Sequence, residues 1–271
     1  MQLAQLQRPQ LELSGPKLRL AFEGLVARAE EQGGVEAYVE ALKIKSALFR
    51  DAFAGTLELP VLRTLCAHMA TVRRRAGPYL APAAFEATRA RIARLLEGRE
   101  DTASADERVA AFCREFPEDH EHRWVRDFAA ELLHNVDPER YPLMQRWVWD
   151  TRANTGVIRE IWHGESEDVD RMTLDVPDRY ETFLALREEL SGYLTQNGVF
   201  RDVLFYVDVL TAQVYADYIG ERGGTYLRTD FATPEDPMLH ARRILGLDGV
   251  DAAGRSRLKA VDGDAEIVGN H

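Results

Sequence analysis

Cysteine is scarce in this chain of 271 residues, which contains only Cys66 and Cys113. The two form no Cys-x-x-Cys pair and no cysteine–histidine pattern at zinc-ligand spacing, so neither a disulfide framework nor a structural zinc site is expected. The longest apolar stretches fall far short of the roughly 20 residues that cross a bilayer. Residues 1–13 contain no basic region followed by an apolar run, so no signal peptide is visible and the cytoplasm is the expected location.

Positive charge is also in short supply. Lysine and arginine number 34 against 45 acidic residues, which gives a formal net charge of −11 at pH 7. This balance opposes attraction to nucleic acid or to an anionic membrane, because both require cationic side chains. Residues 61–99 nevertheless hold eight basic and two acidic side chains, whereas residues 160–236 hold 17 acidic and six basic ones. Such asymmetry marks either a partner-binding face or, more commonly, two halves that complement each other within one fold.

Common catalytic motifs are missing as well. The sequence has no glycine-rich phosphate loop, no Gly-x-Ser-x-Gly elbow and no His-Glu-x-x-His pair. The double glycines at 33–34 and 223–224 are interpreted as helix ends. The motifs therefore predict no cofactor.

What the sequence does contain is a regular series of signals for the start and end of helices. Prolines stand where helices begin and glycines where they end, while strand signals are nearly absent. The clearest start is Ser104, which with Glu107 matches a capping box. The acidic segment 165–170 is interpreted as a loop. The expected helices cover residues 16–32, 35–54, 60–76, 82–97, 105–116, 118–135, 177–196, 200–220 and 234–245.

This pattern predicts a compact all-α protein of about nine or ten helices with a bundle-like arrangement. The segment 200–220 is apolar almost all round, so it is expected to be the central, buried helix. A weak boundary near residue 100 divides an N-terminal four-helix part, residues 1–100, from a C-terminal helical part, residues 101–250. Residues 251–271 have little to bury and are expected to form a mobile tail.

Two Glu-x-x-His motifs are the sharpest candidate for chemistry. They are Glu131–His134 and Glu160–His163, and facing pairs of this kind build di-iron sites in four-helix bundles. His120 and Asp127 fall on the same helical stripe as the first motif. Apolar residues occupy the opposite side of each helix, so both polar stripes are predicted to face solvent. We therefore expect no convergent metal site.

A second candidate is the segment 140–154, which concentrates tryptophan and arginine. These residue types anchor protein interfaces and stack on bases. The alternative is a turn whose aromatic side chains fill the core between two helices. The binding candidates in this segment are Arg140, Tyr141, Arg146, Trp147, Trp149 and Arg152.

A third candidate is Asp208, which lies in the middle of the apolar helix 200–220, with Tyr215 two turns later. A carboxylate there is costly unless it is paired or hydrogen-bonded. We expect Asp208 to be buried and bonded to an arginine or tyrosine of segment 140–154. A structural ion pair is favoured over a binding or catalytic acid, although buried acids do gather at functional sites.

Because no catalytic motif stands without a simpler structural explanation, the sequence favours a non-catalytic helical interaction or accessory protein. Its partner is expected to be another protein or a second copy, with no role for a membrane. The alternative is an enzyme or small-molecule binder with a pocket around Asp208 and the 140–154 turn. A Glu-x-x-His metal oxidase and a nucleic-acid binder have less support.

Overall fold

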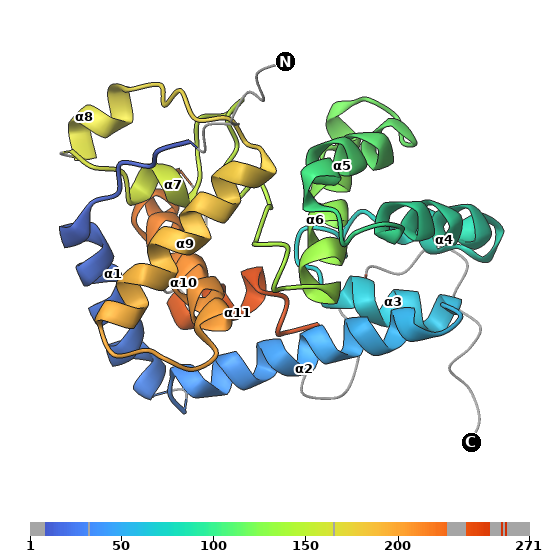
Figure 1. The fold of residues 1–271 in the computed structure, drawn as a ribbon, viewed down its shortest axis with the longest axis horizontal. Helices are drawn as coiled ribbons and strands as arrows, with labels where there is room; N and C mark the ends of the chain where they lie inside the picture. The colour runs from blue at the N-terminus through green and yellow to red at the C-terminus, as the bar shows by residue number, and fades with distance from the viewer. Residues whose placement is uncertain are drawn as a thin grey trace, which may run out of the picture. The chain divides into compact units, whose positions relative to one another are not determined.

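The computed structural model describes residues 9–31, 33–164, 166–226, 237–249, 256 and 258. These residues form helices α1 to α11 and three short 3-10 helices, η1 to η3, which together cover more than half of the chain (Figure 1). The described part contains no β-strand, and its β pairing consists of isolated bridges such as Leu13–Trp162 and Asp150–Thr155. The predicted all-α class is therefore confirmed. None of the described helices is both long enough and apolar enough to cross a membrane.

The helices gather into two compact units, and neither unit is continuous in sequence. Unit 1 comprises residues 1–43 and 138–241, and unit 2 comprises residues 44–137 and 242–271. The chain passes from one unit to the other inside α2 (Val35–Ala54), between Asp137 and Pro138, and inside α11 (Pro237–Ile244). The boundary suggested near residue 100 lies within unit 2, and that division remains a prediction. The expected tail 251–271 falls almost wholly outside the described residues.

Unit 1 is built around α10 (Val203–Tyr226), which packs against α1 (Gly15–Glu30), α7 (Val157–Glu160) and α9 (Tyr180–Gln196). Figure 1 shows α9 and α10 lying against each other. Residues 207–214 of α10 are all buried, because apolar side chains occupy most of its circumference and neighbouring elements cover the whole stretch. The predicted central helix is therefore confirmed.

Both ends of α10 differ from the sequence expectation. The helix begins at Val203 rather than at Phe200, because Asp202 adopts a left-handed backbone with φ of 51° and its carbonyl accepts hydrogen bonds from the N–H groups of Phe205 and Tyr206. The helix also continues past Gly220 to Tyr226. A glycine permits a helix to end but does not force it to.

Unit 2 is centred on three helices that pack pairwise: α4 (Pro82–Leu96), α5 (Ala105–Arg114) and α6 (Trp124–Val136). Rings of Phe112, Phe116, Trp124 and Phe128 fill the space between α5 and α6, with centroids 5.2–6.2 Å apart. The remaining elements of unit 2 are α3 (Leu59–Ala67), η1 (Gly77–Leu80), η2 (Thr102–Ser104) and η3 (His120–His122).

Three local expectations are corrected by the structure. α5 begins where predicted, but the capping box is not formed, since Ser104 ends η2 and its hydroxyl donates to the Asp101 carbonyl instead. α3 ends at Ala67, whereas the sequence predicts a helix to residue 76, so the arginines at 73–75 lie beyond the helix. The acidic segment expected as a loop forms a short helix, α8 (Ser166–Arg171).

The turn before α7 depends on Gly156. Its φ is 127°, in the left-handed range that side chains disfavour, and a Cβ there would lie 2.6 Å from the Val148 carbonyl oxygen. That carbonyl accepts the N–H of Ile158 at 3.2 Å, so it has little freedom to move aside. Only glycine fits both the backbone angle and the close approach.

We predict that Gly156→Ala lowers the free energy of unfolding by about 2 kcal/mol or more, because backbone strain and a steric clash coincide. The matched control is Gly192→Ala inside α9, where a Cβ meets nothing within 4 Å. Better helix propensity should raise stability there by about 0.5–1 kcal/mol. Urea unfolding of both variants is the measurement, and equal effects at the two positions would contradict the prediction.

Candidate functional site

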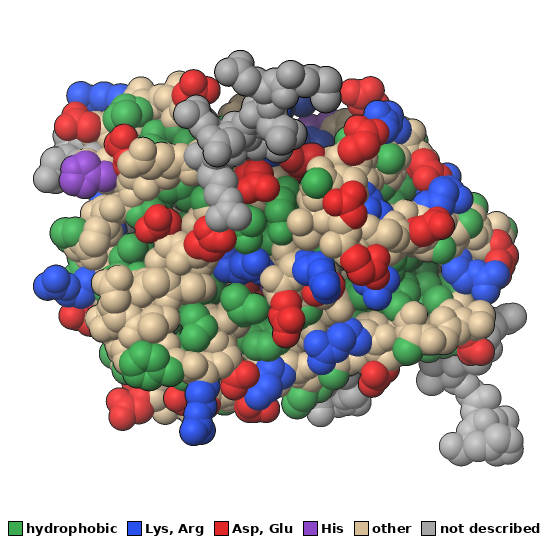
Figure 2. Space-filling view, in the orientation of Figure 1, with side chains coloured by type: hydrophobic (Ala, Val, Ile, Leu, Met, Phe, Trp, Pro, Cys, Tyr) green, Lys and Arg blue, Asp and Glu red, His purple; other side chains and the backbone are tan. Residues whose placement is uncertain are grey.

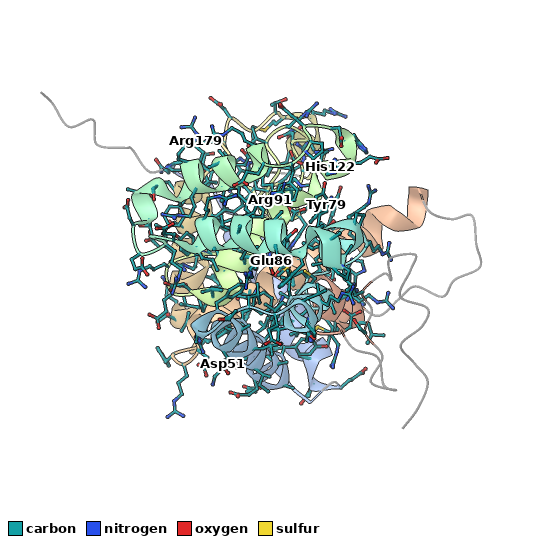
Figure 3. All side chains as sticks on the ribbon, turned by 90° about the vertical axis from the view of Figure 1, so that its right-hand side faces the viewer. Asp51, Tyr79, Glu86, Arg91, His122 and Arg179 are labelled. Carbon is teal, nitrogen blue, oxygen red and sulfur yellow. The ribbon has the colours of Figure 1, made fainter. Side chains whose placement is uncertain are left out.

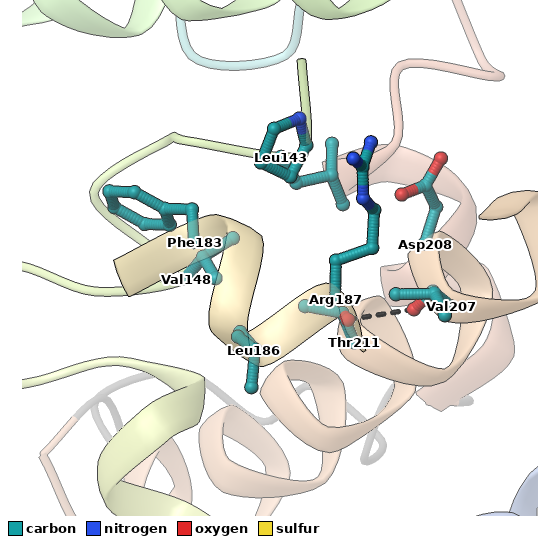
Figure 4. Close-up of a pocket in the computed structure, with 9 residues that line it drawn as sticks. Leu143, Val148, Phe183, Leu186, Arg187, Val207, Asp208 and Thr211 are labelled. Carbon is teal, nitrogen blue, oxygen red and sulfur yellow. Dashed lines mark hydrogen bonds between the residues drawn. The ribbon is translucent and has the colours of Figure 1, made fainter. Parts of the chain in front are cut away.

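A small cavity in unit 1 lies beside Asp208 (Figure 4). It is formed where α9 and α10 meet the turn after Pro138, and its volume of about 10 Å³ leaves room for a single water molecule. Figure 4 shows the Arg187 and Asp208 side chains at the same end of the cavity. Arg187 Nη1 donates to the Pro138 carbonyl at 2.9 Å, which fixes α9 against the turn. The lining residues are Pro142, Leu143, Val148, Phe183, Leu186, Arg187, Val207, Asp208 and Thr211.

Asp208 is 4% exposed, so its predicted burial is confirmed. The residue takes part in a polar or electrostatic interaction and is not a free acid. That its partner comes from segment 140–154 remains a prediction. With space for one water beside it, the carboxylate serves the packing of α10 better than the binding of an organic substrate.

The segment 140–154 turns its tryptophans inward. Trp149 is fully buried and its indole N–H donates to the Val176 carbonyl at 2.9 Å, while the Trp147 ring lies 5.4 Å from that of Tyr215. Tyr141 is also fully buried, with its ring 5.9 Å from Tyr180. The aromatic side chains therefore fill the core of unit 1, as in the alternative given for this segment. The candidates on its surface are Arg140, which is exposed, Arg146, which is half-buried, and Arg152, which is exposed.

The first Glu-x-x-His motif is buried, so the solvent-facing stripe predicted for it is wrong. Asp127, Glu131 and His134 are at most 5% exposed, because α6 is covered on every side and not only on its apolar face. His120 does not belong to this helix; it lies in η3, before α6 begins.

Glu131 is held by a buried ion pair with Lys45 of α2. The Lys45 Nζ lies 3.1 Å from Glu131 Oε2 and also donates to the Leu245 carbonyl at 2.9 Å. Asn135 Nδ2 donates to the same carboxylate oxygen at 2.9 Å. Burial, followed by the negative charge of Glu131, raises the pKa of the neighbouring Cys66 thiol far above its usual range. Cys66 is therefore an unreactive core residue.

The second motif offers no complement to the first. Glu160 is half-buried at the end of α7, and His163 is exposed just beyond it, in unit 1, whereas Glu131 belongs to unit 2. Within the described part of the chain, no group of three His, Cys, Asp or Glu side chains is arranged to hold a metal ion.

The basic segment 61–99 is largely neutralised inside unit 2. Arg73 is buried and pairs with Asp248 at 2.7 Å, and Arg94 pairs with Glu115. Arg63 donates to the Leu80 carbonyl through two of its nitrogens. This local pairing weakens the interpretation of the segment as a binding face.

Two features that the sequence reasoning missed stand out at the surface. In unit 1, Phe200 is 74% exposed in the connection between α9 and α10. The sequence pattern predicts this residue as the start of the buried helix. The aspartate at position 202 was the available signal, because aspartate is a preferred residue just before a helix and would have moved the start past Phe200.

In unit 2, three side chains form a hydrogen-bonded relay. Asp119 Oδ1 lies 2.7 Å from His122 Nδ1, and His122 Nε2 lies 2.8 Å from the Tyr79 hydroxyl. Figure 3 shows Tyr79 and His122 together with Arg91 of α4. No sequence signal pointed to this site, because Tyr79 and His122 are 43 residues apart and lie in separate 3-10 helices.

No family model, no curated protein and no solved structure matches this chain. The evidence for its function therefore lies in its own residues.

We predict that Asp208→Asn lowers the free energy of unfolding by about 1–3 kcal/mol, because a buried carboxyl group loses an interaction while its neighbours stay in place. Asp51→Asn on the exposed side of α2 is the control and should change stability by less than about 0.5 kcal/mol. Thermal or urea unfolding compares the two. A stable Asp208→Asn protein would show that the carboxylate is not a structural requirement.

The ion pair yields a second prediction. Glu131→Leu leaves the Lys45 ammonium buried without its carboxylate, and stability should fall by about 3–5 kcal/mol. Adding Lys45→Met removes the stranded charge and should recover most of that loss. The double-mutant cycle is measured by urea unfolding. Additive losses in the double variant would show that the two residues are not coupled.

Proposed function

We propose that the chain is a helical interaction protein that binds another protein through the α9–α10 connection, with Phe200 as the apolar anchor. The observation that carries the proposal is the exposure of this large aromatic ring on a short segment with a fixed backbone. Buried aromatic anchors supply much of the binding energy at protein interfaces.

The connection is held on both sides of Phe200. Val199 N–H donates to the Leu194 carbonyl at 3.0 Å, and Asn197 Nδ2 donates to the Tyr193 carbonyl at 2.8 Å. On the other side, Asp202 keeps its left-handed backbone and pairs with Lys43 at 3.3 Å. Unfavourable backbone conformations of this kind gather at functional sites. An anchor on a fixed segment loses little conformational freedom on binding.

The charged side chains near this anchor are of both signs: Arg201 is exposed next to Phe200, and Asp202 pairs with Lys43. Glu40 pairs with Lys43 at 2.7 Å, and Glu36 accepts a 2.8 Å hydrogen bond from the Tyr206 hydroxyl. Burial and the bond to Glu36 raise the pKa of Tyr206 to about 12, so its hydroxyl remains a donor at neutral pH. A partner that fits this surface offers an apolar pocket with side chains of both charges at its rim.

The apolar contact is a single side chain rather than a broad patch. On the face shown in Figure 2, hydrophobic side chains alternate with charged ones. The alternative of an enzyme or small-molecule binder centred on Asp208 has less support, because its cavity holds one water. A metal oxidase is disfavoured because Lys45 already neutralises Glu131.

The test is affinity capture from the source cells with the full chain, followed by binding measurements on the purified pair. We expect a partner that wild type and Leu20→Ser retain and Phe200→Ser loses. Leu20 is the matched control, since it is 71% exposed but lies on α1. Loss of an anchor should weaken binding by about 2 kcal/mol or more, roughly 30-fold.

Sedimentation of the purified wild type shows whether the partner is a second copy. The proposal is overturned if Phe200→Ser binds every partner as tightly as wild type does. It is also overturned if wild type neither captures a protein nor self-associates.

A further inference from the structure

The Asp119–His122–Tyr79 relay contains the three groups found where a hydroxyl is activated for attack. In the same order, these are a group that orients the base, the base itself and the nucleophile. A carboxylate can only accept hydrogen bonds, so the Asp119 contact places the imidazole hydrogen on His122 Nδ1. His122 Nε2 then presents its lone pair to the Tyr79 hydroxyl, 2.8 Å away. The phenol is therefore the donor and the imidazole is ready to take its proton.

Asp119 holds His122 by two contacts, one to the imidazole and one to the backbone. Its Oδ1 also accepts the backbone N–H of His122 at 3.0 Å, as the residue that caps η3. The side-chain hydrogen bond with His122 is the main cause that lowers the pKa of Asp119 below its usual value. Asp119 is therefore charged at neutral pH, and it is a positioning residue for the base.

The phenol ring of Tyr79 is fixed by aromatic neighbours. Its centroid lies 5.0 Å from Phe116 and 5.7 Å from Trp124. Burial raises the pKa of Tyr79, and the positive charge of Arg91 opposes that rise. At rest the hydroxyl is therefore protonated, and it needs a base before it can attack.

Arg91 of α4 supplies positive charge beside this phenol. Its guanidinium lies 4.7 Å from the centre of the Phe116 ring, and its Nε is 3.6 Å from Glu115 Oε2. Glu115 is hydrogen-bonded to Arg94 instead, through both of its carboxylate oxygens. Among the described residues, no hydrogen bond engages the two terminal nitrogens of Arg91. A guanidinium with these donors open is suited to bidentate binding of a phosphate group.

We propose that Tyr79 is a nucleophile that accepts the phosphoryl group of a phosphate ester, with His122 as the base and Arg91 binding the phosphate oxygens. The Tyr79 oxygen forms a bond to phosphorus while the bond from phosphorus to the ester oxygen breaks. The phenol proton passes to His122 Nε2 and then to the departing alkoxide, which leaves as an alcohol. The phosphoryl group remains on Tyr79 until water or a second alcohol removes it by the same route reversed.

This activity goes beyond the interaction proposed for Phe200 and does not depend on it. The relay lies in unit 2 and the anchor in unit 1, so each can fail without the other. Arg91 decides the substrate class, because an anionic phosphate uses its charge and a neutral carboxylic ester does not.

The test uses the full chain with p-nitrophenyl phosphate as the probe and p-nitrophenyl acetate as the uncharged comparison. We expect release of p-nitrophenolate from the phosphate ester, and peptide mass mapping should locate a phosphoryl group on Tyr79. Tyr79→Phe should abolish both signals. His122→Gln should lower kcat by about 10²–10⁴-fold, the usual range for loss of a general base.

Three further variants separate catalysis from folding. His120→Gln changes an exposed histidine of the same 3-10 helix and should leave the rate unchanged. Asp119→Asn keeps a capping side chain but loses the carboxylate, so kcat should fall while KM stays the same. Arg91→Lys keeps the positive charge but loses the planar guanidinium that can bind a phosphate through two nitrogens, so KM for the phosphate ester should rise about tenfold. Thermal unfolding establishes that each variant is folded.

The proposal is overturned if wild type releases p-nitrophenolate no faster than Tyr79→Phe, or if the phosphoryl group is mapped to another residue. Faster cleavage of the acetate than of the phosphate ester would overturn the assignment of substrate class. If Tyr79→Phe does not fold, the decision rests on the mapped residue and on the contrast between His122→Gln and His120→Gln.

Discussion

Each unit buries a carboxylate in a stretch of helix that is covered on every side, and much of the structure follows from that constraint. Glu131 in α6 and Asp208 in α10 are 2% and 4% exposed. An acid in such a place requires a partner supplied by another element, and it requires that element to stay at hydrogen-bonding distance. The partner of Glu131 is Lys45, whose position in α2 is thereby fixed within unit 2.

The same ammonium also locates the segment that follows α11. Lys45 donates to the Leu245 carbonyl, and one residue later the Gly246 carbonyl lies 3.1 Å from His68 Nδ1. Gly246 has a φ of 70°, and a Cβ there would overlap the His68 carbonyl oxygen. Arg73 then binds Asp248. A few residues from near the C-terminus are thus built into the polar interior of unit 2.

The sequence predicts local features of this fold well, because they depend on neighbouring residues. Most helices begin and end near their proline and glycine signals, and the burial of Asp208 follows from the apolar surroundings within its own helix. The burial of Glu131 could not be found in this way. A helical wheel ranks the faces of one helix against each other, but the cover over the polar face of α6 comes from Lys45, 86 residues earlier.

The candidate sites were harder to predict than the fold. Helical periodicity gives no information about short 3-10 turns, and the relay joins two of them through Tyr79 and His122. The exposure of Phe200 depends on where α10 starts, and a difference of three residues moves the ring from a buried helix to an exposed connection. Segment 140–154 shows the opposite error. Its tryptophan and arginine content is typical of an interface, but its tryptophans pack in the core of unit 1.

The chain crosses between the two units at three places, and these crossings determine the order in which each unit can fold during synthesis on the ribosome. Residues 44–137 emerge as one continuous stretch and contain α3 to α6, so unit 2 can gather its helices early and lacks only the segment after residue 241. Residues 1–43 must wait for α7, α9 and α10, which begin more than a hundred residues later. Because contacts between distant parts of a chain form slowly, the apolar side of α1 stays uncovered until α10 has been synthesised. The α1 segment is therefore open to non-native contacts during this interval, the situation in which chaperones act.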